Sequence, residues 1–414
     1  MIKKVSISLL ILLIILNFGL IFKKKNSLNN SKKITFWSIQ LKPVYEKQIY
    51  NVINEFEKEH KSYKIVWIDI PLQEAQKRTL ASVLSSTPPD LINLNPDFSI
   101  LLAQRNVLEF FKEEDTLDYN KNLIEKLKYK DKIYALPFYF TSPVTIYNKE
   151  ITDKCLKNKI KTYDDIYKNS SKIKECSGVS PFVSSINEND TFYKILNKYG
   201  VSNLKTNFEK NQALKVYSMF NEMYKNSYLP KDILTINHRE VVEKYMSNQA
   251  AYVVIGSNFV NMIKQNANDI YEKSQIEEQL TTSNGKYDIA LMNLIIPKKA
   301  KNKELALEFI KLLTNKENQL ELSKITNVLP ANKYALEDDY FKNCSDDLYD
   351  KSRCISASQL KNLITLKTPL ENKKVINELF NKTLEEILLD ENSSNETIKA
   401  KIEILAKELE KLEG

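Results

Sequence analysis

Aromatic and amide side chains are concentrated where the expected strands of this chain end. These residues are Trp37, Gln40, Asn93, Asn95, Phe138, Tyr139, Tyr252, Ser257, Asn258 and Asn293. Flat aromatic faces bind apolar C–H surface, while amide and hydroxyl groups both donate and accept hydrogen bonds. A saccharide presents both kinds of surface, so we expect these residues to bind a polyhydroxylated ring, with Tyr139 and Tyr252 as the stacking residues.

Several of these residues also have a purely structural interpretation. Trp37 and Phe138 suit a hydrophobic core as well as a binding surface. Asn95 precedes a proline and suits a turn, and Asn258 suits the N-cap of a helix. A helix that begins near Ser257 would add backbone N–H donors to the site.

Most other kinds of site lack the residues they need. The chain has only six glycines, none spaced as in a phosphate-binding loop, and its two histidines are His60 and His238. The composition therefore predicts neither a cofactor nor a metal. No lysine or arginine directly adjoins the candidate residues, which favours a neutral ligand over a phosphorylated one.

The four cysteines are Cys155, Cys176, Cys344 and Cys354, and no CxxC pair occurs. An even count with local spacing suits two disulfides in an exported chain. The alternative is four unpaired, buried thiols. The sequence leaves the connectivity open.

The N-terminus indicates export. Residues 5–22 form an uncharged run of Leu and Ile, with lysines on both sides and no small-residue cleavage site after it. This run is long enough to span a membrane. We expect an uncleaved anchor, with a cleaved signal peptide as the alternative, and a short tether over residues 26–33. The body would then lie outside the cytoplasm.

Net charge argues against nucleic acid as a partner. The chain carries a net charge of +8, but residues 1–33 hold seven lysines and no acid, which leaves about +1 for the remainder. A nucleic-acid-binding face needs concentrated basic charge, and this body has acids and bases interspersed.

The body alternates strands with helices. Strands are expected over 34–38, 63–70, 90–95, 250–255 and 287–296, and helices over 72–86 and 302–314. Residues 150–250 look mainly helical, as does most of the C-terminal part. This pattern predicts an α/β fold with helices on the faces of a sheet, in which ligands bind beyond the carboxyl ends of strands. At 414 residues, two domains are expected.

The stretch 134–148 is where we expect the chain to leave one sheet for another. Pro137 and Pro143 bracket three consecutive aromatic residues, and proline interrupts a strand ladder because it has no N–H donor. We expect these aromatics to face a ligand between two lobes.

The order of segments resembles the extracellular solute-binding proteins of ABC importers, in the carbohydrate-type branch that includes maltose- and glycerol-phosphate-binding proteins. The similar stretches are Ile34–Ser38, Thr87–Asn95, Lys132–Tyr139, Ile146–Lys149, Gln249–Phe259, Asp288–Pro297, the helix 302–314 with Thr314–Gln319, and Val328–Pro330. Together they span nearly all of residues 34–340. The chain departs from that branch in lacking a lipid-anchored cysteine near its start. It also has Phe138 and Asn258 where many members have Trp.

The resemblance implies a type II periplasmic-binding-protein fold with two discontinuous lobes joined by crossover hinges, preceded by the N-terminal hydrophobic helix. The implied segments are 1–33 for the anchor and tether, 34–143 and 287–330 for lobe 1, and 144–286 and 331–414 for lobe 2. It further implies a monomer that closes over a sugar or oligosaccharide and delivers it to the transmembrane subunits of a permease.

Two alternatives stay open. The same fold could bind a peptide, a polyamine or a glycerophosphodiester. A more distant alternative is a membrane-anchored glycoside hydrolase using paired carboxylates, with Asp69, Asp90 and Asp288 as nominees. Asp90 and Asp288 begin strands, away from the expected binding edge, so we do not expect an enzyme.

Overall fold

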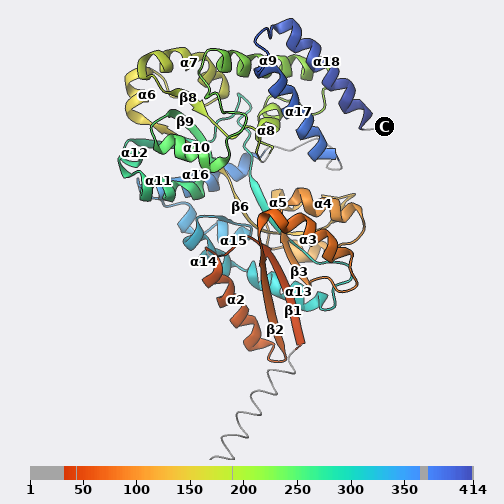
Figure 1. The fold of residues 1–414 in the computed structure, drawn as a ribbon. Coiled ribbons are helices and arrows are strands. Elements are labelled where there is room, and N and C mark those ends of the chain that lie inside the picture. Colours follow the sequence, from red (N-terminus) through yellow and green to blue (C-terminus); the bar gives the residue numbers. More distant parts are fainter. Residues whose placement is uncertain (1–31, 43, 189, 364–371, 413–414) are drawn as a thin grey trace, which may run out of the picture.

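The computed structural model describes residues 32–42, 44–188, 190–363 and 372–412 (Figure 1). Two sheets, each covered by helices, form two bodies that lie one above the other in this view. We call them the six-stranded body and the four-stranded body. Each has its own hydrophobic core, and the chain passes between them several times.

The six-stranded sheet has the order β12-β6-β11-β3-β1-β2. Its strands are β1 (Lys32–Ile39), β2 (Tyr63–Ile70), β3 (Leu91–Leu94), β6 (Leu136–Thr141), β11 (Ala290–Ile295) and β12 (Leu329–Pro330). β1 pairs in parallel with β2 and β3, whereas β11 is antiparallel to both β3 and β6. β6 therefore runs in the same direction as β1, β2 and β3.

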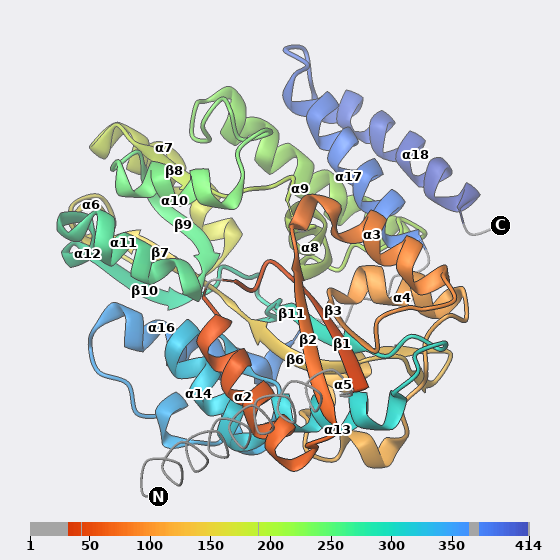
Figure 2. The same ribbon diagram turned by 60° about the horizontal axis from the view of Figure 1, so that its bottom comes forward.

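Helices cover both faces of this sheet (Figure 2). The helical elements and the small hairpin of this body are α2 (Glu46–Glu59), α3 (Leu72–Leu84), α4 (Pro96–Gln104), η1 (Glu113–Thr116), α5 (Lys121–Glu125), β4 (Lys128–Tyr129), β5 (Lys132–Ile133), α13 (Lys303–Leu313), α14 (Lys316–Thr326), α15 (Lys333–Leu336) and η3 (Asp339–Phe341). β2 and β3 lie on opposite sides of β1, so right-handed crossovers place α2 and α3 on opposite faces. The buried face of α2 is Ile49, Val52, Ile53 and Phe56, at the spacing of one helix stripe.

The four-stranded sheet has the order β10-β7-β9-β8. Its strands are β7 (Pro143–Asn148), β8 (Ser180–Val183), β9 (Ala250–Gly256) and β10 (Ser274–Glu278). Neither β8 nor β10 was expected from the sequence. Residues 150–250 are mainly helical, as predicted, and β8 is a short strand among those helices. Its buried apolar run is only four residues long, too short to stand out among the helices around it.

Helices surround this second sheet. They are α6 (Lys149–Cys155), α7 (Tyr163–Ser177), α8 (Thr191–Lys198), α9 (Asn207–Lys225), α10 (His238–Met246), η2 (Ser257–Phe259), α11 (Val260–Asn266), α12 (Asn268–Glu272), α16 (Leu348–Ser358), α17 (Lys373–Leu388) and α18 (Asn395–Lys411). The short η4 (Gln359–Asn362) follows α16, and its Leu360 packs in the core of the six-stranded body. The α9 stripe of Ala213, Val216, Tyr217 and Phe220 is buried, as core packing predicts. α17 and α18 pack on α9 at the outer side of this body (Figure 1).

Two disulfides restrain the chain. Cys155 pairs with Cys176 and so joins the ends of α6 and α7. Cys344 pairs with Cys354 and ties the segment before α16 to that helix. All four cysteines of the sequence are thereby used.

The break near residue 142 differs from the sequence prediction. β6 runs through Phe138, Tyr139 and Phe140, and only Ser142 separates it from β7. The register between β6 and β11 shifts at Asn293, which is opposite Pro137. The proline thus disturbs the ladder without ending the strand, because a bulge absorbs its missing N–H donor.

The expected anchor, residues 5–22, lies outside the described residues. Among the residues that the structure does describe, no helix has both the length and the apolar character needed to cross a bilayer.

Candidate functional site

The edges of the two sheets meet where the chain passes from one body to the other. The parallel strands β1, β2, β3 and β6 end on the same edge, at Ile39, Ile70, Leu94 and Thr141. Gly256, the last residue of β9, pairs with Pro143, the first of β7. Side chains that follow these strands therefore lie at the junction of the two bodies, which is where a binding site is expected.

A buried network, formed by Ser142, Gln279 and Gln359, joins three crossings of the chain. Gln359 Nε2 donates to Ser142 Oγ and to the Pro143 carbonyl, both at 2.9 Å. Gln359 Oε1 accepts from the Gln279 N–H at 2.8 Å, and Gln279 Nε2 donates to the Asp288 carbonyl at 2.9 Å. Because these buried amides satisfy one another, this crossover network fixes the relative positions of the crossings.

A buried ion pair lies beside the crossover network. Lys198, at the end of α8, places Nζ 3.1 Å from Asp288 Oδ2 and donates to Gln279 Oε1 at 2.7 Å. Burial acts to raise the pKa of Asp288, but the ammonium groups of Lys198 and Lys194 outweigh it, so the pKa lies below its usual value. Asp288 is thus ionised and forms an ion pair with Lys198.

Tyr139 lies at the junction, two residues before the end of β6, and is half-buried. Its ring packs against Tyr45 at the start of α2, with the ring centroids 5.4 Å apart. Burial raises the pKa of Tyr45 to about 12, although hydrogen bonds from Tyr139 and Thr326 partly offset it. Two phenol rings therefore lie side by side near the carboxyl ends of the strands.

Trp37 on β1 is also half-buried. The Arg78 guanidinium, from α3, lies 5.7 Å from its ring centroid, and the indole Nε1 is buried with no hydrogen-bond partner. A buried donor without a partner is uncommon. This ring therefore retains an unused hydrogen-bond donor close to the strand edge.

The structure corrects the expectation for Phe138 and Tyr252. Phe138 has no exposed surface and lies in the core of the six-stranded body. Tyr252 is 1% exposed, stacks on Tyr147 and hydrogen-bonds Thr152 through its hydroxyl. Tyr252 is near the start of β9 rather than at its carboxyl end, so its ring packs in the core of the four-stranded body.

Three polar candidates are buried as well: Asn93, Asn293 and Ser257. Asn93 Nδ2 donates to the Asn293 carbonyl at 3.1 Å, and Asn293 Nδ2 donates to Ser99 Oγ at 2.8 Å. These amides connect β3, β11 and α4 inside the sheet. They do not present groups to a solute in this structure.

Three candidates are exposed near the strand ends: Gln40, Asn95 and Asn258. Gln40 follows β1 with a left-handed φ of 51°. Asn95 Oδ1 accepts from the Phe98 N–H at 2.8 Å and caps α4, so the structural interpretation of this residue holds. The structure thus brings these three amides, Tyr139 and Trp37 to the edges where the bodies meet.

The loop after β8 was missed in the sequence because β8 itself was missed. Ser185 Oγ and Glu188 Oε2 each lie 2.6 Å from Nδ1 of His238. These two short contacts share one ring nitrogen, and Ser185 Oγ also lies 3.3 Å from Nε2, whereas a hydrolytic triad uses one ring nitrogen for the hydroxyl and the other for the carboxylate. Gly178 and the apolar residues after it were the available sequence signal for this strand.

Lysines reach the junction from segments that the strand-end pattern did not include. Lys126 follows α5, Lys194 and Lys198 are on α8, and Lys373 begins α17. Burial lowers the pKa of Lys126 to about 8, with a further contribution from Lys194 and Lys373. These lysines lie around Asp97 and Asp288, and the cation found beside a candidate residue is Arg78, on the Trp37 ring.

The nominated catalytic carboxylates are occupied by structural contacts. Asp69 accepts from Ser38 Oγ and from the N–H groups of the loop after β1. Asp90 accepts from the Thr35 and Asn302 N–H groups, both at 2.9 Å. Within the described ranges, no group of His, Cys, Asp and Glu side chains is placed to hold a metal ion.

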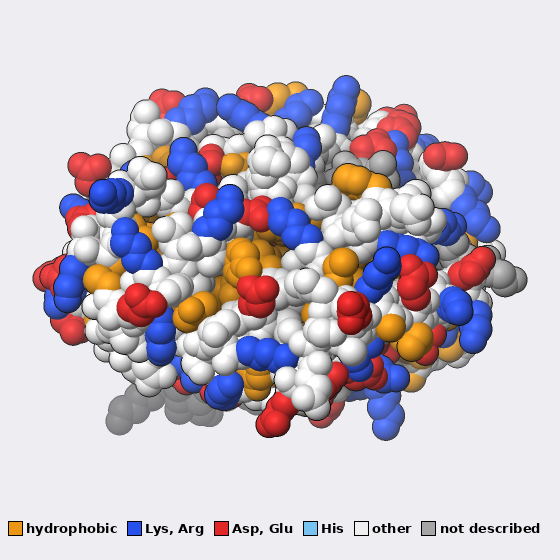
Figure 3. Space-filling view, turned by 90° about the horizontal axis from the view of Figure 1, so that it is seen from above, with side chains coloured by type: hydrophobic (Ala, Val, Ile, Leu, Met, Phe, Trp, Pro, Cys, Tyr) orange, Lys and Arg blue, Asp and Glu red, His pale blue; other side chains and the backbone are white. Residues whose placement is uncertain are grey.

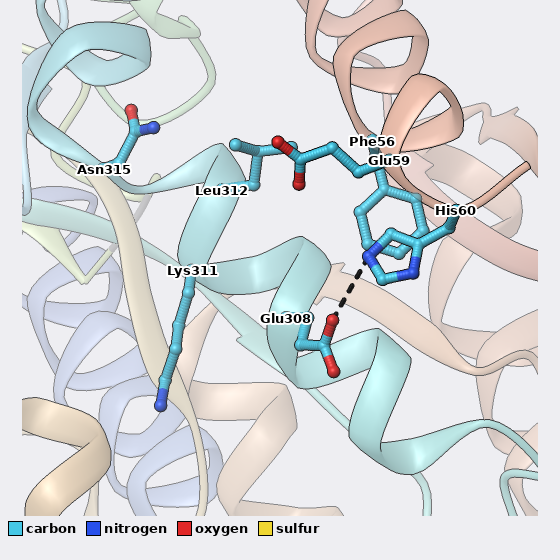
Figure 4. A pocket seen from close by; sticks show the side chains of 7 residues that line it. All are labelled: Phe56, Glu59, His60, Glu308, Lys311, Leu312 and Asn315. Carbon is cyan, nitrogen blue, oxygen red and sulfur yellow. Dashed lines mark ion pairs between the residues drawn. The ribbon is translucent and has the colours of Figure 1, made fainter.

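A cavity of about 250 Å³ lies elsewhere, between α2 and α13 (Figure 4). His60 Nε2 is 3.2 Å from Glu308 Oε2 on its wall, and the His60 ring stacks on Phe56. α2 runs from Tyr45 at the junction to His60, so this cavity is at the far end of that helix. A second cavity, of about 370 Å³, lies between α9 and α18.

Acidic and basic side chains are interspersed over the outer face of the four-stranded body (Figure 3). No single-sign field covers the face in this view. Such mixing agrees with the nearly neutral body expected from the sequence.

The chain matches known proteins over most of its length. Residues 51–346 match the family model described as bacterial extracellular solute-binding protein. A Brucella abortus protein described as a binding protein is 21% identical over 328 residues, which are 75% of this chain and 78% of the relative.

Solved structures share the fold. A Synechococcus sp. MITs9220 structure, described as an oligosaccharide periplasmic-binding protein, matches with a TM-score of 0.79 and 23% identity, covering 91% of this chain and 99% of that one. A maltose-bound protein of T. maritima matches with a TM-score of 0.72 and 17% identity, covering 92% and 99%. At these identities the likeness shows the periplasmic-binding-protein fold.

Proposed function

The chain belongs to the family of bacterial extracellular solute-binding proteins, a binding family rather than an enzyme family, and on that premise we propose that it captures a sugar or oligosaccharide for an ABC importer. The solute would bind between the two bodies at the strand edges. The permease subunits that would receive it are separate chains.

The observation that carries this proposal is the combination of rings and amides at the junction. Tyr139 and Trp37 are half-buried there, and Gln40, Asn95 and Asn258 are exposed beside them. A half-buried ring retains a face for C–H groups, and exposed amides supply both donors and acceptors for hydroxyls. The related structures described as an oligosaccharide-binding protein and as maltose-bound support the same class of solute.

A second candidate is favoured by the lysines. A glycerophosphodiester or another anionic solute would meet Lys194 and Lys126. Burial is the main cause of the lowered pKa of Lys126, and the positive field of Lys194 and Lys373 lowers it further. The same field opposes a polyamine, because a cationic solute would be repelled. Among the non-sugar alternatives, the lysines therefore favour an anionic solute over a polyamine.

We further propose the cellular arrangement implied by the sequence. Residues 5–22 would anchor the protein in the cytoplasmic membrane as a monomer, with the body outside the cytoplasm. Segments 34–143 and 287–330 would form one lobe together with α15 and η3, which pack in the six-stranded body, and 144–286 with the remaining C-terminal helices would form the other. Solute contacts to both lobes would favour the closed arrangement by shifting its population.

The test is a thermal-shift panel on residues 34–414 with mono- and oligosaccharides, glycerol phosphates and polyamines. A binder at 100 times its Kd stabilises the fold by about 2.7 kcal/mol and raises Tm by several degrees. We expect a saccharide to give this shift without being turned over. A shift with glycerol phosphates alone would establish the anionic candidate, and turnover of an oligosaccharide would overturn the assignment to binding.

A matched pair of variants locates the site. Tyr139→Ala should weaken binding of the identified solute. Tyr50→Ala should not, because Tyr50 is 42% exposed on α2, more than one turn beyond Tyr45, the residue that packs on Tyr139. Equal affinities of both variants and wild type would remove Tyr139 from the site.

A further inference from the structure

A lysine from one body is bound by a carboxylate from the other. Lys373 Nζ lies 2.8 and 2.9 Å from the two carboxylate oxygens of Asp97, and 2.7 Å from Asp190 Oδ2. We call these three residues the Lys373 bridge. The ammonium group is thus shared between two carboxylates, one of which it contacts through both oxygens.

The three residues come from different parts of the fold. Asp97 is in the first turn of α4, which packs in the six-stranded body. Lys373 begins α17 and Asp190 precedes α8, and both helices pack in the core of the four-stranded body. Of the ion pairs between described residues, only the Lys373–Asp97 pair connects α-helices of the two bodies.

The bridge is well shielded on its lysine side. The Lys373 side chain is 11% exposed and that of Asp190 is 18%, whereas Asp97 is 49% exposed. Burial alone would lower the pKa of Lys373, but Asp97 and Asp190 outweigh it and the pKa is raised. Lys126 is another cation nearby, and its charge interacts with those of Asp97 and Lys373.

Local contacts hold Asp190 and Lys373 in place within the four-stranded body. Asp190 has a left-handed φ of 58°, which few non-glycine residues adopt. Asn372, next to Lys373, donates from Nδ2 to the Leu412 carbonyl at 2.7 Å and so ties the start of α17 to the end of α18. The Lys373–Asp190 half is therefore part of one body, and the contact with Asp97 is the half that spans the junction.

We propose that Lys373 is a positioning residue for solute binding, because its contact with Asp97 holds the two bodies in the closed arrangement before the solute arrives. The inference rests on closure of the two bodies and not on the identity of the solute. Opening the junction separates Asp97 from Lys373, while Asp190 stays with the lysine. The bridge therefore slows both entry and release of the solute, because it keeps the site shut with and without solute.

The two carboxylates allow a matched test on the full chain without solute. Asp97→Asn removes the contact across the junction, Asp190→Asn removes only the contact within one body, and Lys373→Met removes both. Small-angle X-ray scattering at low and high salt reports the radius of gyration. Denaturation midpoints establish that each variant is folded, and Lys373→Gln, which also removes the charge, serves where Lys373→Met does not fold.

We expect wild type to be compact at low salt and to expand at high salt. Asp97→Asn should be expanded at both, and Asp190→Asn should behave like wild type. For a half-exposed pair, the open population should rise about 5-fold on losing Asp97. Identical scattering of wild type and Asp97→Asn at low salt, or a wild type that is already expanded, would overturn the proposal even if a saccharide binds.

Once a solute is identified, stopped-flow binding adds a second measure. Asp97→Asn should associate and dissociate faster than wild type, by about the same 5-fold factor. An unchanged association rate together with an unchanged radius of gyration would identify the bridge as a static contact.

Discussion

Gln359 and Ser142 are 217 residues apart in the sequence, yet Gln359 Nε2 donates to Ser142 Oγ over 2.9 Å. Gln359 Oε1 accepts from the Gln279 N–H in the same buried place. One amide therefore satisfies groups from two other crossings of the chain. Its removal leaves several buried partners without a hydrogen bond.

Gln359→Ala should destabilise the protein by about 2–3 kcal/mol, since buried donors and acceptors that lose their partner pay their desolvation cost. The measurement is the urea-unfolding midpoint and slope. The control is Ser358→Ala at the neighbouring exposed position, which should change stability by less than about 0.5 kcal/mol. Equal effects of the two substitutions would contradict the role of Gln359.

Tyr252→Ala should unfold the protein rather than weaken solute binding selectively. The side chain is 1% exposed, and replacing a buried aromatic residue with alanine costs about 3–5 kcal/mol. Tyr252→Phe should cost only about 1 kcal/mol, for the lost hydrogen bond with Thr152. Chemical denaturation separates the two. A stable Tyr252→Ala protein with weakened sugar binding would restore Tyr252 to the site.

Asp288→Asn should cost about 3 kcal/mol at pH 7, because it leaves the buried Lys198 ammonium without its carboxylate. Lys198→Met combined with Asp288→Asn should recover part of that loss, since no buried charge then remains. A double-mutant cycle of urea midpoints measures the coupling. Additive effects of the two substitutions would show that the residues do not interact.

The same pair gives a pH dependence. The folded pKa of Asp288 is below its ordinary value of 3.8, so its contribution to stability is fully present above about pH 4. That contribution is lost as the pH falls further through the folded pKa, where the carboxylate takes up a proton. Wild type should therefore lose more stability between pH 5 and pH 2 than Asp288→Asn does. Parallel stability curves would contradict the assignment.

The Cys344–Cys354 disulfide should stabilise residues 342–347, the segment that leads into α16. It closes a loop with a sequence separation of 10 residues, and a crosslink of that size contributes about 2–3 kcal/mol. Replacing both cysteines with serine should speed proteolysis within residues 342–347. The matched control replaces Cys155 and Cys176, which should leave cleavage at that segment unchanged. Equal cleavage rates in both variants would argue against this local role.

Much of the fold could be predicted from the sequence because its signals are local. β2 was expected over the residues it occupies, and the buried stripe of α2 follows from the spacing of its apolar residues. Strand ends marked by proline, as at Pro297, also gave good boundaries. Short buried strands such as β8 and β10 lack such signals, so they were missed.

The candidate site was predicted less well, for a physical reason. Strand-end position is readable from the sequence, but the direction of a side chain depends on register and on what covers it. Tyr139 and Phe138 are adjacent, yet Tyr139 is half-buried at the junction and Phe138 is in the core. Nothing local in the sequence marks Lys373, because its position depends on how the C-terminal helices pack back onto the body.

Ser142 is the single residue between β6 and β7, and Pro143 next to it has a fixed φ. Few torsions are therefore available there to accommodate a relative rotation of the two sheets. A small angular change at this pivot is amplified with distance, as in a lever, so the outer helices α9 and α18 travel farther than any group near the bound solute. Donor and acceptor fluorophores attached to those outer helices and to α13 would therefore report occupancy optically.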